Sequence, residues 1–277
     1  MNAVKTRILS GITGAILFLF LVLKGGLLLT VAVGALSFLA TVEVGKIFKK
    51  SGVDLHYPLA LFFNLLFFAG EVCWGQPVVR GGSLRIGDWF ALVAFILLFV
   101  SFLTYMGKGV TQATLVALVS HLFILFYTGF LFIYPLLIRQ LVNPDGWQLL
   151  LFAFGVIWGT DTGAYFIGSA LGKTPLAPRL SPKKTVEGAV GGLAVGTLAG
   201  VLLGLFFQLP VFWLVGTGIL ASFAGQVGDL FASFLKRVAG IKDSGRFLPG
   251  HGGVLDRFDS ALFSLPVVYY LASFLLR

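Results

Sequence analysis

The chain has 277 residues, of which 58 % are hydrophobic and only 11 % are charged. Soluble globular domains carry about 25 % charged residues, so this composition excludes an ordinary soluble protein and indicates a polytopic membrane protein. The net charge of +9 does not indicate nucleic-acid binding, because the basic residues fall in short loops between apolar runs. A single cysteine, Cys73, excludes a disulfide framework.

Several apolar segments have the length of a membrane-spanning helix, which is roughly 17–25 residues. They are residues 8–23, 27–45, 57–75, 88–106, 112–138, 147–171, 187–207, 211–234 and 258–276. Residues 139–146 are predicted to form a loop, because Asn-Pro and Asp-Gly pairs in this stretch are turn signals. We therefore expect an all-α polytopic membrane protein with about nine transmembrane helices.

The basic residues predict how these helices are oriented. All of the 20 lysines and arginines lie on one side of the expected membrane except Lys24, Arg80, Arg85, Arg139 and Arg277. Short loops rich in lysine and arginine stay in the cytoplasm, so the N-terminus is expected to be cytoplasmic. The longest polar segments, 172–186 and 235–257, then share the cytoplasmic face and can meet there. We divide the chain into N-terminal scaffold helices, 1–140, and a C-terminal catalytic region, 147–277.

The densest cluster of charge lies between Gly228 and Phe263. Charge close to a membrane is costly, so such a cluster indicates a functional site. Asp229 lies near the end of an apolar segment, and Ser233 follows at a spacing that puts both residues on one helical face. The remaining polar residues of this segment are Lys236, Arg237, Lys242, Asp243, Arg246, His251, Asp256, Arg257 and Asp259.

This mixture of residues points to phosphate chemistry. Carboxylates with few sulfur or imidazole partners favour hard cations such as Mg²⁺, which bridge substrate phosphates. Lysine and arginine neutralise the phosphates that a metal does not reach. Acidic and basic groups together at a membrane surface therefore suggest phosphoryl or nucleotidyl transfer. The alternative is that these charges merely pair with one another as interfacial salt bridges and helix caps.

A second group of polar residues precedes this cluster. Asp161 lies in the middle of an apolar segment, where an aspartate is expensive and is expected to face a polar cavity, or else to bond neighbouring helices. The loop that follows contributes candidate substrate-binding residues, and Thr185 and Glu187 are also candidate caps of the next helix. These candidates are Arg179, Ser181, Lys183, Lys184, Thr185 and Glu187. The basic cluster is equally typical of a topology signal or of nonspecific binding to lipid headgroups.

Three isolated polar residues in the N-terminal half carry less functional signal. Glu43 and Glu71 lie within or near the end of a span, and we interpret them as helix-packing or interface groups in preference to catalytic ones. His121 is a lone histidine on an apolar helix and is expected to form a hydrogen bond between helices.

The quoted residues resemble the signature of the phosphatidate cytidylyltransferase family, also called CDP-diacylglycerol synthases. That signature reads S-x2-K-R-x4-K-D-x-G/S/A-x2-L/I/F-P/G/S-x-H-G-G-x-x-D-R-x-D. The matching residues are Ser233, Lys236, Arg237, Lys242, Asp243, Gly245, Leu248, Pro249 or Gly250, His251, Gly252, Gly253, Asp256, Arg257 and Asp259. Two upstream patterns are also similar, D-x-x-A-Y-x-x-G from Asp161 and S-P-x-K-T-x-E-G from Ser181. The specific motifs cover roughly 155–265.

The chain departs from the family pattern at two positions. Many members have glutamate just before the signature serine, where this chain has Ala232, so any role of that carboxylate is absent or supplied elsewhere. Val186 replaces an aromatic residue that is often found in the second upstream motif, which affects packing or base stacking.

The resemblance implies a Mg²⁺-dependent reaction in which CTP and phosphatidate give CDP-diacylglycerol and pyrophosphate, at the cytoplasmic face of the inner membrane. Membrane lipids are then partners, and a homodimer is compatible with the arrangement. Our candidate metal ligands are Asp229 and Asp256 first, then Asp259 and Asp161, and Asp243 last, for Mg²⁺ alone or with a second cation. Candidate phosphate-binding residues are Lys236, Arg237, Lys242, Arg246, Lys183 and Lys184, while Ser233 and His251 are expected to orient ligands or loop backbone.

Two other functions remain open at this point. A CTP-dependent lipid-alcohol kinase would use similar residues on a different lipid. A cation-coupled transporter would use Asp161 and Asp229 as intramembrane carriers, but the chain shows no pair of similar halves.

Overall fold

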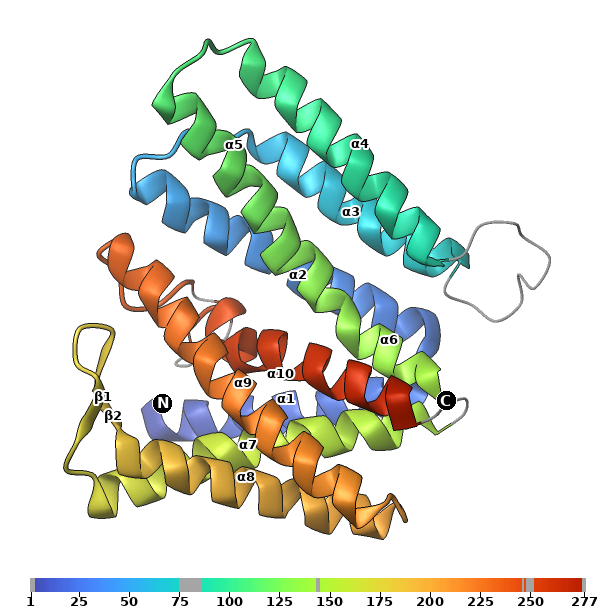
Figure 1. Ribbon diagram of the computed structural model, residues 1–277, viewed down its shortest axis with the longest axis vertical. Helices are drawn as coiled ribbons and strands as arrows, with labels where there is room; N and C mark the ends of the chain where they lie inside the picture. Colours follow the sequence, from blue (N-terminus) through green and yellow to red (C-terminus); the bar gives the residue numbers. More distant parts are fainter. Residues whose placement is uncertain (1–2, 75–85, 143–144, 246, 248–251, 276–277) are drawn as a thin grey trace. The chain divides into compact units, whose positions relative to one another are not determined.

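A computed structural model describes residues 3–74, 86–142, 145–245, 247 and 252–275, and is almost entirely helical in these ranges (Figure 1). The chain divides into two compact units. Unit 1 comprises Met1–Ile133 and Asp243–Leu255, and unit 2 comprises Tyr134–Lys242 and Asp256–Arg277. Part of the charged segment 235–257 therefore groups with the N-terminal helices.

Unit 1 is built from long helices in which consecutive members pack against each other. Its elements are α1 (Ala3–Lys24), α2 (Gly26–Lys50), α3 (Tyr57–Trp74), α4 (Ile86–Met106), α5 (Gln112–Ile124), the π-helical turn η1 (Leu125–Phe130) and the 3-10 turn η2 (Leu131–Ile133). Buried hydroxyl and amide groups join α2, α3 and η1, because the Asn64 amide donates to Ser37 Oγ and Thr41 Oγ1 at 2.8 and 2.9 Å. The Thr128 hydroxyl lies 2.7 Å from Thr41 Oγ1.

Unit 2 contains the elements that carry most of the predicted site residues. They are α6 (Tyr134–Leu141), α7 (Gly146–Leu171), β1 (Pro175–Ala177), β2 (Ser181–Thr185), α8 (Val186–Phe206), α9 (Val211–Val238) and α10 (Leu255–Leu275). Helices α7 and α8 lie side by side, because a stripe of glycines on α8 faces α7 and lets the two backbones approach closely. Helix α9 packs against both.

The expected apolar helices are present. Of the described residues, six helical segments are long and apolar enough to cross a membrane: Gly26–Lys50, Gln112–Leu141, Gly146–Leu171, Val186–Phe206, Val211–Val238 and Leu255–Leu275. Shorter apolar helical stretches occupy Gly11–Lys24, Tyr57–Gly70 and Ala91–Met106. In the described residues the predicted apolar segments are therefore largely helical, and the protein is a multi-pass, all-α membrane protein; the count of about nine spans stays a prediction.

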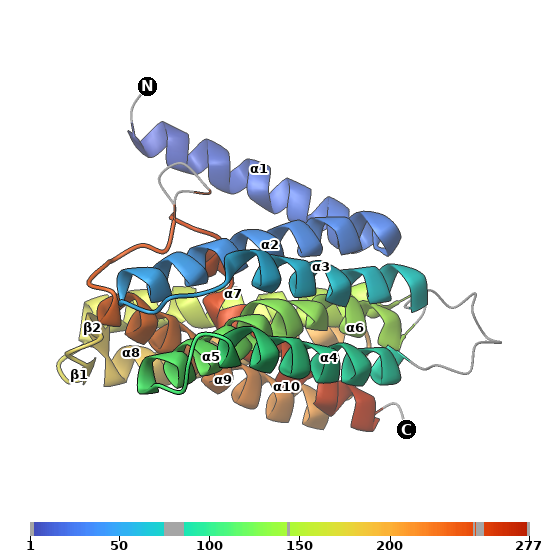
Figure 2. The same ribbon diagram turned by 90° about the horizontal axis from the view of Figure 1, so that it is seen from above.

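The structure differs from the sequence-based expectation in two local features. Residues 175–185 form a short antiparallel hairpin, in which Ala177 pairs with Ser181. It projects from one end of the α7–α8 pair, as a view turned by 90° also shows (Figure 2). In addition, α6 continues to Leu141, so the predicted loop 139–146 begins later than expected. Proline at 175 and 182 made the hairpin hard to predict, because proline is disfavoured inside strands.

His121 behaves as predicted. Its Nδ1 atom lies 3.2 Å from the hydroxyl oxygen of Tyr105 on α4, and the two rings meet edge to face. The histidine is 1 % exposed, so it serves as a buried interhelical hydrogen-bonding group.

Candidate active site

The first contact of the site joins the hairpin to α9. Lys184 on β2 forms an ion pair with the Asp229 carboxylate on α9. Each of these side chains is 30 % exposed, so both are reachable from outside the helix bundle. The sequence offered Asp229 no local partner, and the structure supplies one from 45 residues away. This pair joins the polar segment 172–186 to α9, six residues before the segment 235–257 begins.

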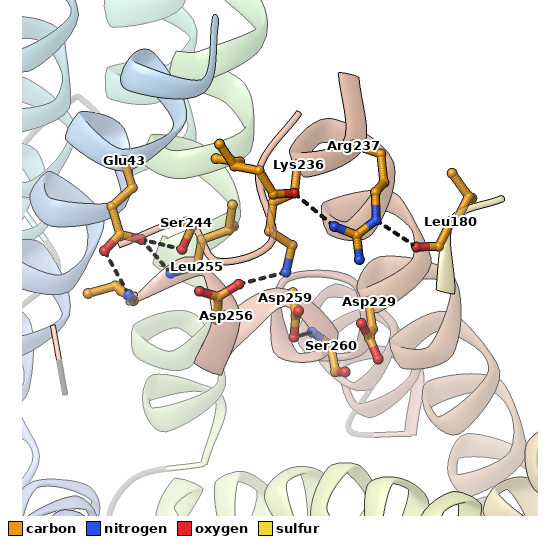
Figure 3. A network of polar contacts seen from close by, with 12 residues as sticks. Glu43, Leu180, Asp229, Lys236, Arg237, Ser244, Leu255, Asp256, Asp259 and Ser260 are labelled. Carbon is orange, nitrogen blue, oxygen red and sulfur yellow. Dashed lines mark hydrogen bonds and ion pairs between the residues drawn. The ribbon is translucent and has the colours of Figure 1, made fainter. Parts of the chain in front are cut away.

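A second lysine–aspartate pair lies deeper. The ammonium of Lys236, near the end of α9, lies 2.6 Å from Asp256 Oδ1 in the first turn of α10 (Figure 3). The two side chains are only 11 % and 10 % exposed. Burial of two charges is tolerated because each neutralises the other, and it would be costly to leave either one alone.

Close approach of α9 and α10 places a third carboxylate beside this pair. A Cβ atom on Gly228 would lie 2.5 Å from the carbonyl oxygen of Asp259, so glycine is needed where the two helices touch. Asp259 is 9 % exposed, and its Oδ1 accepts a hydrogen bond of 2.8 Å from the Ser260 amide. Gly228 therefore brings the neighbouring Asp229 close to Asp259.

Acidic groups on three helices interact electrostatically with one another. The carboxylates of Asp161 on α7, Asp229 on α9 and Asp259 on α10 repel one another electrostatically, while Lys184 and Arg257 attract Asp161. Asp161 lies on the accessible surface of the bundle. Asp161 therefore interacts electrostatically with Asp229 and with the lysine that pairs with it.

The donor set suits a hard cation in its chemistry. It consists of carboxylate oxygens, which Mg²⁺ prefers, and two of these carboxylates hold lysine ammonium groups. Within the described residues, no three histidine, cysteine or acidic side chains are gathered closely enough to hold a metal ion. The carboxylates are thus of the type that Mg²⁺ prefers, but the described ones are not gathered as a metal site, and Asp229 and Asp256 contact lysine instead.

The hairpin is tied to its neighbours by side chains from the predicted set. Arg237 donates to the carbonyl oxygens of Leu180, at 3.2 Å, and Ile241, at 2.8 Å (Figure 3). Glu187 accepts hydrogen bonds from the amides of Lys173 and Thr174. These bonds fix both ends of the hairpin, and with them the position of Lys184.

The predicted cap of α8 is also present. Thr185 is the N-cap residue, and its Oγ1 accepts a hydrogen bond of 3.1 Å from the Gly188 amide. This bond satisfies one of the amides that a helix start leaves without an intrahelical partner.

The remaining predicted residues lie around this cluster or outside the described ranges. Ser233 and Ser181 are partly buried, whereas Arg257 is exposed at the start of α10. Arg179, Lys183, Lys242 and Asp243 are exposed. Arg246 and His251 lie outside the described residues, as does the side chain of Glu71.

Glu43 is the residue whose importance the sequence did not indicate. It lies on α2 and is 8 % exposed. It accepts hydrogen bonds from Ser244, Val254 and Leu255, which lie at the two ends of residues 244–255, called the signature loop below. Its position within an apolar helix suggested a packing group, and only its partners more than 200 residues away distinguish it.

The fold and the site together define a class: a polytopic helical membrane protein with clustered aspartates, lysines and arginines, suited to anionic phosphate ligands. A family model described as the cytidylyltransferase family matches residues 5–275. The chain therefore belongs to the cytidylyltransferase family, and the match extends well beyond the 155–265 region that carries the motifs.

Several curated relatives share nearly the full length of the chain. A phosphatidate cytidylyltransferase of Bacillus subtilis (strain 168) is 38 % identical over 273 residues, covering 98 % of each chain. Proteins of the same name from Staphylococcus epidermidis (strain ATCC 35984) and Staphylococcus aureus (strain COL) are 36 % and 34 % identical, each over 96 % of this chain and 98 % of the relative.

Proposed function

We propose that this chain is a membrane phosphatidate cytidylyltransferase, which converts CTP and phosphatidate into CDP-diacylglycerol and pyrophosphate. The family and the names of relatives that share almost the whole chain support this activity. Neither a lipid-alcohol kinase nor a transporter is favoured by these relatives. The function is therefore nucleotidyl transfer in phospholipid biosynthesis.

The observation that carries the proposal is the pair of lysine–aspartate contacts in unit 2. Lys184–Asp229 and Lys236–Asp256 join the hairpin, α9 and α10, and these are the elements that hold the signature residues. In each pair, a phosphate group can replace the aspartate as partner of the lysine. The freed aspartate can then face a cation. The two pairs therefore supply lysines for the phosphates of a nucleotide and aspartates for the metal ion bound to it.

In the proposed reaction, a phosphate oxygen of phosphatidate attacks the α-phosphorus of CTP. The bond from this phosphorus to the oxygen that bridges to the β-phosphorus breaks, and pyrophosphate leaves with that electron pair. The attacking phosphate is already anionic near neutral pH, so a strong general base is not required. Positioning of the two substrates and neutralisation of their charge supply most of the barrier lowering.

Specific residues take these two roles. Lys184, Lys236 and Arg257 bind and neutralise phosphate oxygens, while Arg237 and Glu187 hold the hairpin so that Lys184 is in place. Asp229, Asp256, Asp259 and Asp161 are the residues that would hold Mg²⁺. When bound, this cation supplies further neutralisation of the triphosphate and the lipid phosphate.

The length of α9 fits a site at the membrane boundary. Its 28 residues span about 42 Å at 1.5 Å per residue, whereas the hydrocarbon core of a bilayer is about 30 Å thick. If the charged end protrudes, Asp229 lies near the boundary, within reach of both a lipid phosphate and a water-borne nucleotide. We assign this end to the cytoplasmic face of the inner membrane, because of the bias in basic residues.

Two substitutions test the proposal in purified, folded protein. Asp229→Asn and Asp256→Asn keep the side-chain shape but remove the negative charge, and each is expected to lower CTP- and Mg²⁺-dependent turnover by at least about 100-fold, a loss of about 2.7 kcal/mol of transition-state stabilisation. The measurement is release of pyrophosphate and formation of CDP-diacylglycerol from phosphatidate.

The matched control is Asp54→Asn. Asp54 also pairs with a lysine, Lys108, at 2.7 Å, but its side chain is 84 % exposed, and such surface pairs contribute little. Turnover of this control should equal that of the wild type. Near-normal turnover in both Asp229→Asn and Asp256→Asn would exclude the metal assignment, and formation of a lipid phosphate together with CDP from a polyprenol would indicate the kinase instead.

A further inference from the structure

The two ends of the signature loop meet on one buried carboxylate of unit 1. Glu43 Oε2 accepts hydrogen bonds of 2.9 Å from Ser244 Oγ and from the Leu255 amide, and Oε1 accepts one of 2.9 Å from the Val254 amide (Figure 3). Ser244 precedes Val254 by ten residues. Glu43 therefore closes the loop at its base.

The contact suits a negatively charged acceptor. An ionised carboxylate has two oxygens and donates no hydrogen bond, so it can receive all three donors at once. The described residues contain no lysine or arginine that forms an ion pair with Glu43. The three donors, two of them amides at the positive N-terminal end of α10, therefore compensate the buried charge.

Two signature glycines are explained by the same carboxylate. A Cβ atom on Gly245 would overlap the Glu43 carboxylate, and one on Gly253 would overlap both this carboxylate and Ser244 Oγ. The loop backbone can thus reach the carboxylate only if these positions lack a side chain. Gly245 and Gly253 of the signature therefore each lie against an acid supplied by α2.

The loop end that Glu43 holds leads directly to candidate catalytic residues. Leu255 is the first residue of α10, and Asp256 and Arg257 follow in the same first turn. The Leu255 amide and the Asp256 carboxylate are thus one residue apart on a rigid helical turn. Any movement of the α10 start away from Glu43 also displaces the Asp256 side chain.

We propose that Glu43 is a positioning residue of the reaction: it closes the 244–255 loop and fixes the start of α10, and thereby the placement of Asp256 and Arg257. It acts through the backbone of α10 and does not touch the substrates. The three hydrogen bonds by which Glu43 holds Ser244, Val254 and Leu255 form what we call the clamp. The role of the clamp in turnover rests on the proposed cytidylyltransferase activity, whereas the clamp itself does not.

The substitution that tests the clamp is Glu43→Gln. The glutamine amide keeps the size of the side chain but presents an N–H₂ group to at least one of three donors, so one contact becomes repulsive. We expect hydrogen exchange of the Val254 and Leu255 amides to become at least about tenfold faster, a tenfold change being about 1.4 kcal/mol. Unchanged exchange at these two amides would exclude the clamp, whatever the activity.

Turnover then tests the positioning role. Glu43→Gln should lower kcat at least about tenfold while the KM for CTP changes less than about threefold, because Glu43 contacts neither substrate. The matched control is Thr41→Val on the same helix, which leaves Glu43 in place. It removes a buried hydroxyl that is bonded to Ser37 O, Thr128 Oγ1 and the Asn64 amide. This control should lower the unfolding temperature without lowering kcat.

The outcomes separate the possible failures. An inactive wild type would contradict the proposed function, whereas an active wild type with an unchanged kcat in Glu43→Gln would contradict only the positioning role. If Thr41→Val lowers kcat as much as Glu43→Gln, the glutamate has only a structural role.

A double-mutant cycle adds an independent test. Gly245→Ala alone should lower kcat more than tenfold, because its methyl group collides with the Glu43 carboxylate. In a Glu43→Asp background, where the acid is one methylene shorter, the same change should cost less than about threefold. Equal costs in both backgrounds would mean that the glycine and the glutamate do not act on each other.

Discussion

At the scale of single residues, the site is organised by pairs of opposite charge at different depths. Lys184 and Asp229 are partly exposed, whereas Lys236 and Asp256 are almost fully buried. Partial exposure lets incoming phosphate compete for Lys184, while burial makes the deeper pair a contributor to folding as well. Many family members have glutamate where this chain has Ala232, so this position supplies no acidic group to the described cluster. The alanine is fully buried.

The deeper pair allows stability to be separated from catalysis. Lys236→Met leaves Asp256 buried without its ammonium partner, and the free energy of unfolding should fall by about 3–5 kcal/mol. Replacing both residues, as in Lys236→Met with Asp256→Leu, should recover most of this loss, because two apolar side chains need no partner. Unfolding in mixed detergent micelles provides the measurement.

The double variant should still lack turnover, because both charged groups are gone. If Lys236→Met is as stable as the wild type, the pair is hydrated and does not contribute to folding. If the double variant is active, neither residue belongs to the catalytic set.

At the scale of elements, the site depends on how closely helices approach each other. Gly228 touches the backbone of α10, and the hairpin is held by Arg237 at one end and by Glu187 at the other. The elements that carry charge are thus fixed by contacts between backbones and by hydrogen bonds to backbone atoms. A change that separates two elements should therefore reduce turnover even when every charged residue is retained.

Two glycines on α9 test this dependence. Gly228→Ala places a methyl group against the Asp259 carbonyl oxygen and the Phe263 ring, so we expect a loss of about 1–3 kcal/mol of stability from overpacking. Turnover should fall at least about tenfold, because the carboxylates of Asp229 and Asp259 move apart. The measurements are unfolding in mixed micelles and CDP-diacylglycerol formation.

Gly216→Ala on the same helix is the control. No heavy atom lies within 4 Å of a Cβ at this position, so the change should be neutral, or stabilising by up to about 1 kcal/mol through helix propensity. Equal effects of the two substitutions would show that the contact between α9 and α10 is not critical.

At the scale of the whole molecule, the apolar helices and the bias in basic residues predict which side of the membrane each polar segment faces. The hairpin and the end of α9 should be cytoplasmic, and the connection between α8 and α9 should be on the opposite side. This assignment places the candidate site where CTP is available.

Labelling of single cysteines tests the orientation. In a Cys73→Ser background, Lys183→Cys should react with a membrane-impermeant maleimide only after cells are permeabilised, whereas Gln208→Cys, between α8 and α9, should react in intact cells whose outer layers admit the reagent. Both residues are exposed, so burial does not limit the reaction. The reverse pattern would place the N-terminus outside the cytoplasm.

The sequence alone determined the helices and the set of charged residues, and it did so for a local reason. A helix of about 20 apolar residues satisfies its own backbone hydrogen bonds, so composition and length are enough to predict it. Charge within apolar segments likewise made Asp161 and Asp229 candidate site residues, and the signature did so for Asp256, without any knowledge of their partners. The two proline-containing strands of the hairpin lacked such a local signal and were missed.

Only the tertiary structure decided which groups meet. Lys184 finds Asp229 at a separation of 45 residues, and Glu43 binds Ser244 at a separation of 201. Such pairings depend on how helices pack, and packing follows from the shapes of entire helix faces, including glycines at 228 and 253. For this reason Glu43 looks like an ordinary packing residue in the sequence, whereas in the fold it closes the signature loop.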